Sequence, residues 1–218
     1  MSIPAASEAV SALLRRDRAR RHGTDPLVGM GGLAWRAKDL ELIDRLIAER
    51  RNVLICGGGL TGKSAAAALL AGRIAAARPA ERVLCVLERY PQSVIGDSPG
   101  IVPDPGALKL LAMLRRGAYP PCGSLIFDEI YTSSGAHSVL EAWHRGIMAV
   151  GTVAVAHPEQ GDCLGRIALL ETAYPNGFSR EQVVEMYRTA RPVIVRAVRP
   201  GVIEVGGDVT PIPSWMSE

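Results

Sequence analysis

The sequence predicts an α/β fold of three layers, with a mostly parallel sheet covered by helices on both faces. Short continuous apolar runs alternate with helical patterns along the chain, and such runs are typical of parallel strands buried on both faces. Hydrophobic residues make up 48% of the 218 residues and charged residues 22%, which is close to ordinary globular usage and favours neither a disordered nor a fibrous chain. A glycine-rich segment also joins the first apolar run to a helix.

The chain before residue 38 is predicted to be an N-terminal helical appendage, and residues 38–218 a single domain. Residues 5–21 indicate a helix, and the turn residues HGTDP at 22–26 end it. A cluster of five arginines lies in this helix: Arg15, Arg16, Arg18, Arg20 and Arg21. Because no aromatic residues are interleaved to stack on bases, a solvated helix face is the favoured interpretation. A surface for phosphates, acidic lipid or an acidic protein is the alternative, and direct nucleic-acid binding stays open.

The remaining elements follow from periodicity and from the positions of glycine and proline. Strands are predicted at 53–56, 82–87, 124–127 and 152–156, with a terminal hairpin formed by 193–198 and 202–205. Helices are predicted at 39–50, 64–78, 107–116, 139–145 and 181–188. The proline-rich segment 90–105 is predicted to be a surface loop.

Two negative observations place the chain in a compartment. No run approaches the roughly 18 apolar residues of a membrane span, and the N-terminal basic cluster follows the apolar residues, the reverse of a secretory signal. A cytoplasmic location is therefore expected. The four cysteines lie far apart without a CxxC pair, so reduced thiols in the core are predicted.

The segment GGGLTGKS fits the phosphate-binding pattern G-x-x-x-x-G-K-[ST] without a mismatch. Its backbone N–H groups are expected to surround the β-phosphate of ATP at the N-terminus of the following helix. Lys63 is expected to contact the β- and γ-phosphates, and Ser64 to bind Mg²⁺. The predicted nucleotide-binding residues are Gly57, Gly58, Gly59, Leu60, Thr61, Gly62, Lys63 and Ser64.

Polar residues follow three of the other predicted strands. In SLIFDEI, Asp128 is a candidate to hold magnesium through water, and Glu129 a candidate to orient or deprotonate the attacking water. Glu88 ends RVLCVLE, and His157 follows TVAVA. Because the carboxyl ends of parallel strands meet at one edge of a sheet, these side chains are expected near the phosphates. The non-functional alternative for each is a solvated strand end or a structural histidine.

Four segments in this order resemble the secretion ATPases of type II and type IV systems, in particular the TrbB-like conjugal transfer ATPases. That family has a Walker A motif, an acidic Asp box, a Walker B segment and a His box, which here resemble residues 57–64, Glu88, Glu129 and 151–157. Leu164, Arg166, Ile167 and Leu170 resemble the helix after the His box. The resemblance covers about residues 38–205.

The resemblance implies a P-loop NTPase (RecA-like) fold and ATP hydrolysis. It also implies a homo-oligomeric ring, such as a hexamer, at the cytoplasmic side of an inner membrane. Such a ring would drive conjugal transfer, type IV secretion or pilus assembly together with other components of the machine. Four positions depart from the family pattern: Arg89, Asp128, Val155 and Pro158. The family's N-terminal domain has no room before Gly57, so a partner chain is expected to supply its groups, or turnover is slow.

Two other functions agree with the same glycine-rich motif at residues 57–64, the P-loop. A small P-loop kinase would place its phosphoryl acceptor under the segment 90–105, although such enzymes usually have an arginine-rich lid and this sequence has no clear one. A nucleotide-binding regulator without turnover would need only the P-loop. The retained Glu129 favours hydrolysis over this second alternative.

Overall fold

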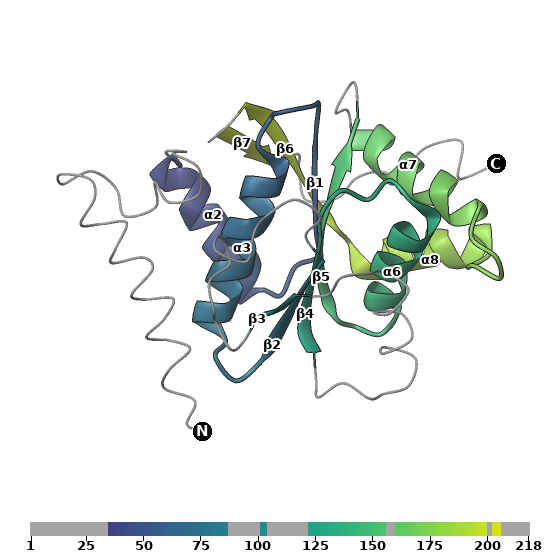
Figure 1. The fold of residues 1–218 in the computed structure, drawn as a ribbon, viewed down its shortest axis with the longest axis horizontal. Coiled ribbons are helices and arrows are strands. Elements are labelled where there is room, and N and C mark those ends of the chain that lie inside the picture. Colours follow the sequence, from purple (N-terminus) through teal and green to yellow (C-terminus); the bar gives the residue numbers. More distant parts are fainter. Residues whose placement is uncertain (1–34, 87–100, 104–121, 156–159, 200–201, 206–218) are drawn as a thin grey trace.

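The computed structural model describes residues 35–86, 101–103, 122–155, 160–199 and 202–205. A central sheet separates two helical layers: α2 and α3 cover one face, and α6, α7 and α8 cover the other (Figure 1). This arrangement confirms the predicted three-layer α/β architecture. Among the residues described, no helix is both long enough and apolar enough to cross a bilayer.

The sheet has seven strands in the order β3-β2-β4-β5-β1-β6-β7. The strands are β1 (Val53–Gly57), β2 (Arg82–Val86), β3 (Ile101–Pro103), β4 (Cys122–Phe127), β5 (Met148–Ala154), β6 (Val193–Arg199) and β7 (Val202–Val205). The first six are parallel to their neighbours, and β7 pairs antiparallel with β6 as the predicted hairpin. Since β5 lies between β1 and β4, the carboxyl ends of β1 and β4 are about 10 Å apart, two strand spacings.

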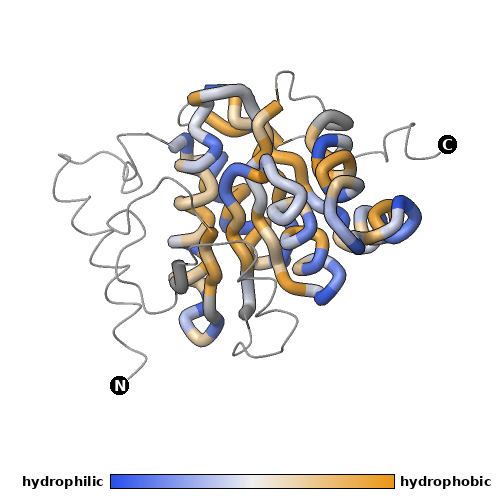
Figure 2. Tube along the Cα trace, turned by 45° about the vertical axis from the view of Figure 1, so that its right-hand side comes forward, coloured by the Kyte–Doolittle hydropathy of each residue, from blue (hydrophilic) through white to orange (hydrophobic). Residues whose placement is uncertain are grey.

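The helices are α2 (Ala37–Ala48), α3 (Lys63–Ala77), α6 (Ser133–His144), α7 (Gln160–Thr172) and α8 (Arg180–Ala190). Successive strand residues alternate between two apolar cores, one on each face of the sheet. On β1, for example, Ile55 packs on the α2–α3 side and Cys56 on the α6–α7–α8 side. Figure 2 shows apolar residues along the strands of the sheet and a mixture of apolar and polar residues along the helices beside it.

Helix α3 buries small side chains against the sheet. Its buried residues include Ala65, Ala66, Ala67, Ala68 and Ala71, all at most 3% exposed. Alanine has no side-chain entropy to lose and is the best helix former. Small contact residues also let a helix lie close to its neighbours. The helix that carries the P-loop is therefore packed tightly on β1 and β5.

The opposite layer is joined by buried polar groups as well as by apolar contacts. His137 Nδ1 of α6 lies 2.7 Å from Glu171 Oε1 of α7, and the His137 ring stacks on Tyr174 and Phe178. The Tyr187 hydroxyl of α8 donates a hydrogen bond to the carbonyl of Leu164. These contacts fix the positions of α6, α7 and α8 relative to one another.

The structure corrects several predicted boundaries. Residues 101–103 form the edge strand β3 within the predicted 90–105 loop, and an edge strand can contain Pro103 because one side of it needs no ladder hydrogen bond. β5 spans 148–154, not 152–156. Helix α6 begins at Ser133, six residues before the predicted start, because the Thr132 side chain accepts a hydrogen bond from Gly135 N as an N-cap.

Several predictions lie outside the described residues. They are the N-terminal helix at 5–21 with its arginine cluster, the remainder of the 90–105 loop, and the helix at 107–116. The division into an appendage at 1–37 and a domain at 38–218 is likewise untested. The helix expected after the His box is present as α7, with Leu164 and Ile167 buried.

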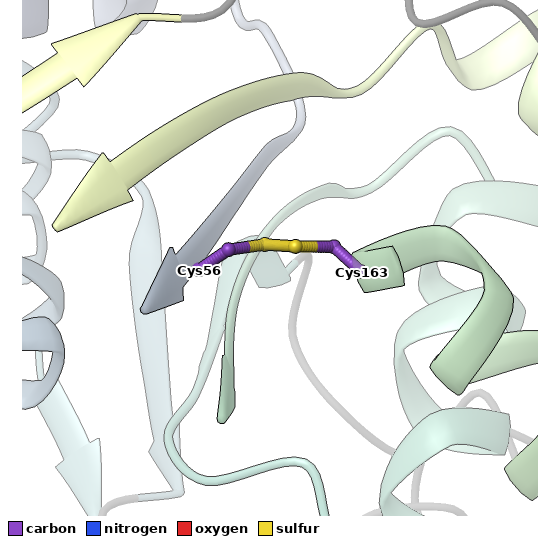
Figure 3. The surroundings of a disulfide bond; sticks show 2 residues. All are labelled: Cys56 and Cys163. Carbon is purple, nitrogen blue, oxygen red and sulfur yellow. A yellow bond between two sulfur atoms is a disulfide. The ribbon is translucent and has the colours of Figure 1, made fainter. Parts of the chain in front are cut away.

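The prediction of reduced core thiols is wrong for two of the four cysteines. Cys56, near the end of β1, forms a disulfide with Cys163 in the first turns of α7 (Figure 3). Their Cα atoms lie 6.3 Å apart although 107 residues separate them in sequence. No sequence pattern indicates this pair, because only the packing of α7 on the sheet brings the two side chains together.

We expect Cys56 and Cys163 to react with an alkylating reagent in the denatured protein only after reduction. Peptide mass spectrometry measures the labelling at each position. Reduction is also expected to lower the free energy of unfolding by about 2–4 kcal/mol, because the bond closes a long loop in the unfolded chain. In the control Cys163→Ala, Cys56 should be labelled without reductant. Labelling of Cys56 in the unreduced parent protein would contradict the disulfide.

Candidate nucleotide-binding and hydrolysis site

The P-loop, residues 57–64, joins the end of β1 to the start of α3. Gly57 has no room for a side chain, since a Cβ there would lie 2.6 Å from the carbonyl oxygen of Ala197 and from Thr61 Oγ1. Gly62, the N-cap of α3, has a left-handed backbone with φ of 89°, which glycine adopts without steric cost. Glycine is therefore favoured at positions 57 and 62 by the structure itself, and both residues shape the turn into α3.

The first turn of α3 provides amide donors at the mouth of the P-loop. The first helical bond after the loop runs from Ala66 N to Gly62 O. The N–H groups at the start of a helix have no acceptor within the helix, and the helix dipole places partial positive charge there. The loop and the helix start together have the form of an anion-binding site.

Lys63 lies inside this turn, with only 8% of the residue exposed. Its Nζ donates a hydrogen bond of 2.6 Å to the carbonyl oxygen of Gly58. Burial lowers the pKa of Lys63 below its ordinary value, and the negative charges of Glu129 and Asp128 oppose that change. The ammonium group thus lies in the field of both acids that follow β4.

Asp128 directly follows β4 and is 1% exposed. Its backbone N–H donates to Val86 O of β2, and its Oδ1 accepts a hydrogen bond of 2.6 Å from Thr152 Oγ1 of β5. Burial raises the pKa of Asp128, and hydrogen bonding from the Thr152 and Ser64 hydroxyls acts in the opposite direction. The Ser64 hydroxyl, at the start of α3, therefore lies close to this carboxyl group.

Glu129 has a backbone that is unusual for a residue with a side chain, with φ of 55°. Its N–H donates a hydrogen bond of 2.7 Å to Thr152 Oγ1. The residue is partly exposed, and its charge acts on both Lys63 and Asp128. The chain leaves the sheet at this residue, so the Glu129 side chain does not follow the alternation of side chains between the two faces of the sheet.

Sequence reasoning missed Thr152, which contacts both acids. From the sequence, Thr152 is predicted only to be the first residue of the strand that precedes His157. A threonine in an apolar strand has no motif around it, and the one available signal was a polar residue in the run MAVGTVAVA. Its partners became visible only through the register, which pairs Phe127 of β4 with Gly151 of β5 and so brings Asp128 beside Thr152.

The structure brings most of the predicted site residues together. The P-loop, with Lys63 and Ser64, lies beside Asp128 and Glu129 across one strand of the sheet. Glu88 and His157 lie outside the described residues, so their placement at this edge stays a prediction. Their strands, β2 and β5, end at the same edge of the parallel sheet as β1 and β4.

The residues present fit a magnesium ion bound together with a nucleotide. Asp128 Oδ2 is buried and makes no regular hydrogen bond within the described ranges, and the Ser64 hydroxyl lies near this carboxyl group. Over the same ranges no group of three or more His, Cys, Asp or Glu side chains could hold a metal by itself. Mg²⁺ usually binds one or two protein oxygens and completes its shell with phosphates and water, which agrees with this donor set.

No protein-family model matches the sequence, and no curated protein matches it. Among solved structures, the chain is similar to the crystal structure of the VirB11 ATPase from the Brucella suis type IV secretion system in complex with sulphate, with a TM-score of 0.59 and 16% sequence identity. The match covers 78% of this chain and 51% of that one, so this chain spans about half the length of its neighbour. The likeness confirms the predicted fold class, an α/β fold with a mostly parallel sheet between helical layers.

Proposed function

We propose that this chain binds ATP with Mg²⁺ and hydrolyses it, as the sequence predicted. The observation that carries the proposal is the meeting of the two motifs: Lys63 and Ser64 of the P-loop lie within electrostatic and hydrogen-bonding range of Asp128. A glycine-rich turn without function would have no reason to face a buried carboxylate from another strand. The VirB11 ATPase of similar fold was crystallised with sulphate, a tetrahedral anion like phosphate, which supports anion binding by this fold.

The chain's own groups would bind the triphosphate in two ways. Backbone N–H groups of residues 57–64 and of the first turn of α3 would donate to the β-phosphate, aided by the helix dipole. Lys63 Nζ would leave the carbonyl of Gly58, now 2.6 Å away, and donate to the β- and γ-phosphate oxygens instead. The Lys63 ammonium group lies within the turn that would bind the phosphates.

Ser64 and Asp128 Oδ2 would hold the magnesium ion, which neutralises charge on the phosphates when it is bound. Glu129 would orient or deprotonate the attacking water. We assign Glu88 and His157 to the same edge as candidates to position water and to contact the γ-phosphate. The chemistry is therefore transfer of the γ-phosphoryl group to water.

The process we propose is the work of a motor subunit in a conjugal transfer, type IV secretion or pilus-type machine. Support comes from the order of the four motif segments and from the shared fold with the VirB11 ATPase. A ring of identical subunits, such as a hexamer, in contact with other machine components at the cytoplasmic side of an inner membrane belongs to the same proposal.

Steady-state phosphate release from the purified chain with ATP and Mg²⁺ tests the proposal. We expect release above that of a Lys63→Ala variant, and loss of release when the Mg²⁺ is chelated. Transfer of label from [γ-³²P]ATP to a small molecule or peptide, with none to water, would favour the kinase alternative. Nucleotide binding without transfer of phosphate to water or to any acceptor, alone or with cognate partners, would favour the alternative of a nucleotide-binding regulator.

A further inference from the structure

Thr152 makes three hydrogen bonds to three consecutive residues of the turn that carries the acids. Its hydroxyl donates to Asp128 Oδ1 at 2.6 Å and accepts from Glu129 N at 2.7 Å. Its backbone carbonyl accepts from Ile130 N at 2.8 Å. Thr152 is fully buried in β5, the strand between β1 and β4. One residue therefore fixes the whole turn to the middle of the sheet.

The turn needs such an anchor because its backbone leaves regular strand geometry. The paired register of β4 and β5 ends at Phe127 and Gly151, and Glu129 then adopts a left-handed φ of 55°. Non-glycine residues are uncommon in this region and persist there only where the surroundings hold them. The hydrogen bond from Glu129 N to Thr152 Oγ1 is one contact that holds this backbone conformation.

The other face of the sheet supports the same turn. Gly151 leaves space that the Ile130 side chain occupies, since a Cβ on Gly151 would lie 2.6 Å from Ile130 Cδ1. The side chain of Thr152 is on the α3 side, the side of the P-loop helix, as its neighbour in register, Ile55, shows. The neighbouring residues Gly151 and Thr152 thus secure the turn from opposite faces.

The single hydroxyl proton of Thr152 decides which oxygen of Asp128 is available. Because the hydroxyl accepts from Glu129 N, its own proton is directed to Asp128 Oδ1. The second oxygen, Oδ2, makes no regular hydrogen bond to any residue in the described part of the chain. Thr152 therefore directs one oxygen of the carboxylate into the sheet and leaves the other for a cation.

We propose that Thr152 is a positioning residue for ATP hydrolysis, which orients the Asp128 carboxylate and holds the left-handed backbone of Glu129. The proposal rests on the proposed ATPase function. Removing the hydroxyl would let both acids turn away from the phosphates, while the backbone N–H groups and Lys63 that bind the phosphates directly stay in place. The loss should therefore appear in kcat and not in the KM for ATP.

Four full-length variants test the role of the hydroxyl. Thr152→Val removes it and keeps the shape, Thr152→Ser keeps it, and Thr152→Ala differs from the serine variant only in lacking it. Thr189→Val, on the exposed side of α8, is the matched control. Measured quantities are kcat and KM for phosphate release with ATP and Mg²⁺, the Kd of a non-hydrolysable ATP analogue, and the Tm of the protein without nucleotide.

The valine and alanine variants are expected to lose about 10- to 100-fold in kcat, as is usual when a group that orients a metal ligand is removed. Their KM and analogue Kd should stay within about threefold of the parent values, and their Tm should fall by a few degrees because a buried carboxylate and N–H lose a partner. The serine variant should retain kcat within about threefold. Thr189→Val should match the parent protein in every quantity.

Parent-like kcat in Thr152→Val would overturn the inference, and so would equal losses in the serine and alanine variants. If the valine variant does not fold, the serine and alanine pair still decides. A parent protein that releases no more phosphate than Lys63→Ala refutes the proposed function and the inference with it. An active parent with an unchanged Thr152 series refutes the inference alone.

Discussion

Lys63→Ala is expected to abolish nucleotide binding and to reduce phosphate release to background. The substitution removes the one ammonium group inside the P-loop turn, now bonded to Gly58 O. Charge-assisted hydrogen bonds contribute about 1.5–3 kcal/mol each, so the loss of two to the phosphates lowers affinity roughly 10²- to 10⁴-fold. The charges of Asp128 and Glu129 would then face the phosphates without compensation, which adds repulsion.

Isothermal titration calorimetry with ATP and Mg²⁺ measures this effect. The matched control is Lys38→Ala, because Lys38 is exposed in the first turn of α2, and it should bind nucleotide like the parent protein. Near-parent affinity in Lys63→Ala, with the Tm unchanged, would remove the P-loop from the binding site. The whole proposal would then lose its main support.

Glu129→Gln is expected to lower kcat by about 10²- to 10⁴-fold, the usual contribution of a general base. The amide has the shape of the carboxylate but cannot take a proton from water. Because one negative charge near Lys63 is removed, the affinity for ATP should be unchanged or tighter. The variant is therefore expected to bind nucleotide and to retain it.

Phosphate release and the Kd of ATP, measured on the same preparation, separate the two effects. Glu185→Gln, on the exposed face of α8, is the control and should behave like the parent. If Glu129→Gln hydrolyses ATP at the parent rate, the base lies elsewhere. Glu88→Gln is then the next variant to measure, because β2 ends at the same sheet edge as β4.

Much of the fold could be predicted because the signals were local. The apolar run 53–56 between Asn52 and the glycines gave β1 to within one residue, and the alanine-rich run after Gly62 gave α3. The hairpin of β6 and β7 followed from two apolar runs around Pro200 and Gly201. In each case a short window contained both the periodicity and the residues that end the element.

Boundaries set by capping or by partners were harder to predict. The α6 start depends on the Thr132 side chain, which replaces a missing helical acceptor, and the apolar pattern alone begins only at Val139. β3 consists of three residues whose strand geometry comes from pairing with Val83–Cys85 and not from their own propensity. Such elements are defined by tertiary contacts, which a single sequence does not display.

The residues of the candidate site also fall into those that local sequence predicts and those that only tertiary contacts bring together. Lys63 and Ser64 belong to a contiguous motif, and Asp128 and Glu129 end an apolar strand, so sequence alone predicted them as candidates. Thr152 joins the site only through strand register, and the Cys56–Cys163 bond only through the packing of α7 on β1. Side chains that act through a neighbour leave no motif, because the neighbour can be far away in sequence.

The alanines that line the inner face of α3 have a bearing on evolution. A helix that packs closely on the sheet has little freedom to slide or tilt, so residues such as Ala67 and Ala71, both fully buried, fix the height of the P-loop above the sheet. A shift of about 1 Å in a reacting group can cost a hundredfold in rate. Larger side chains at these positions of α3 would therefore be expected to lower the rate of hydrolysis although they do not contact the nucleotide. Selection on activity would then also constrain these buried alanines.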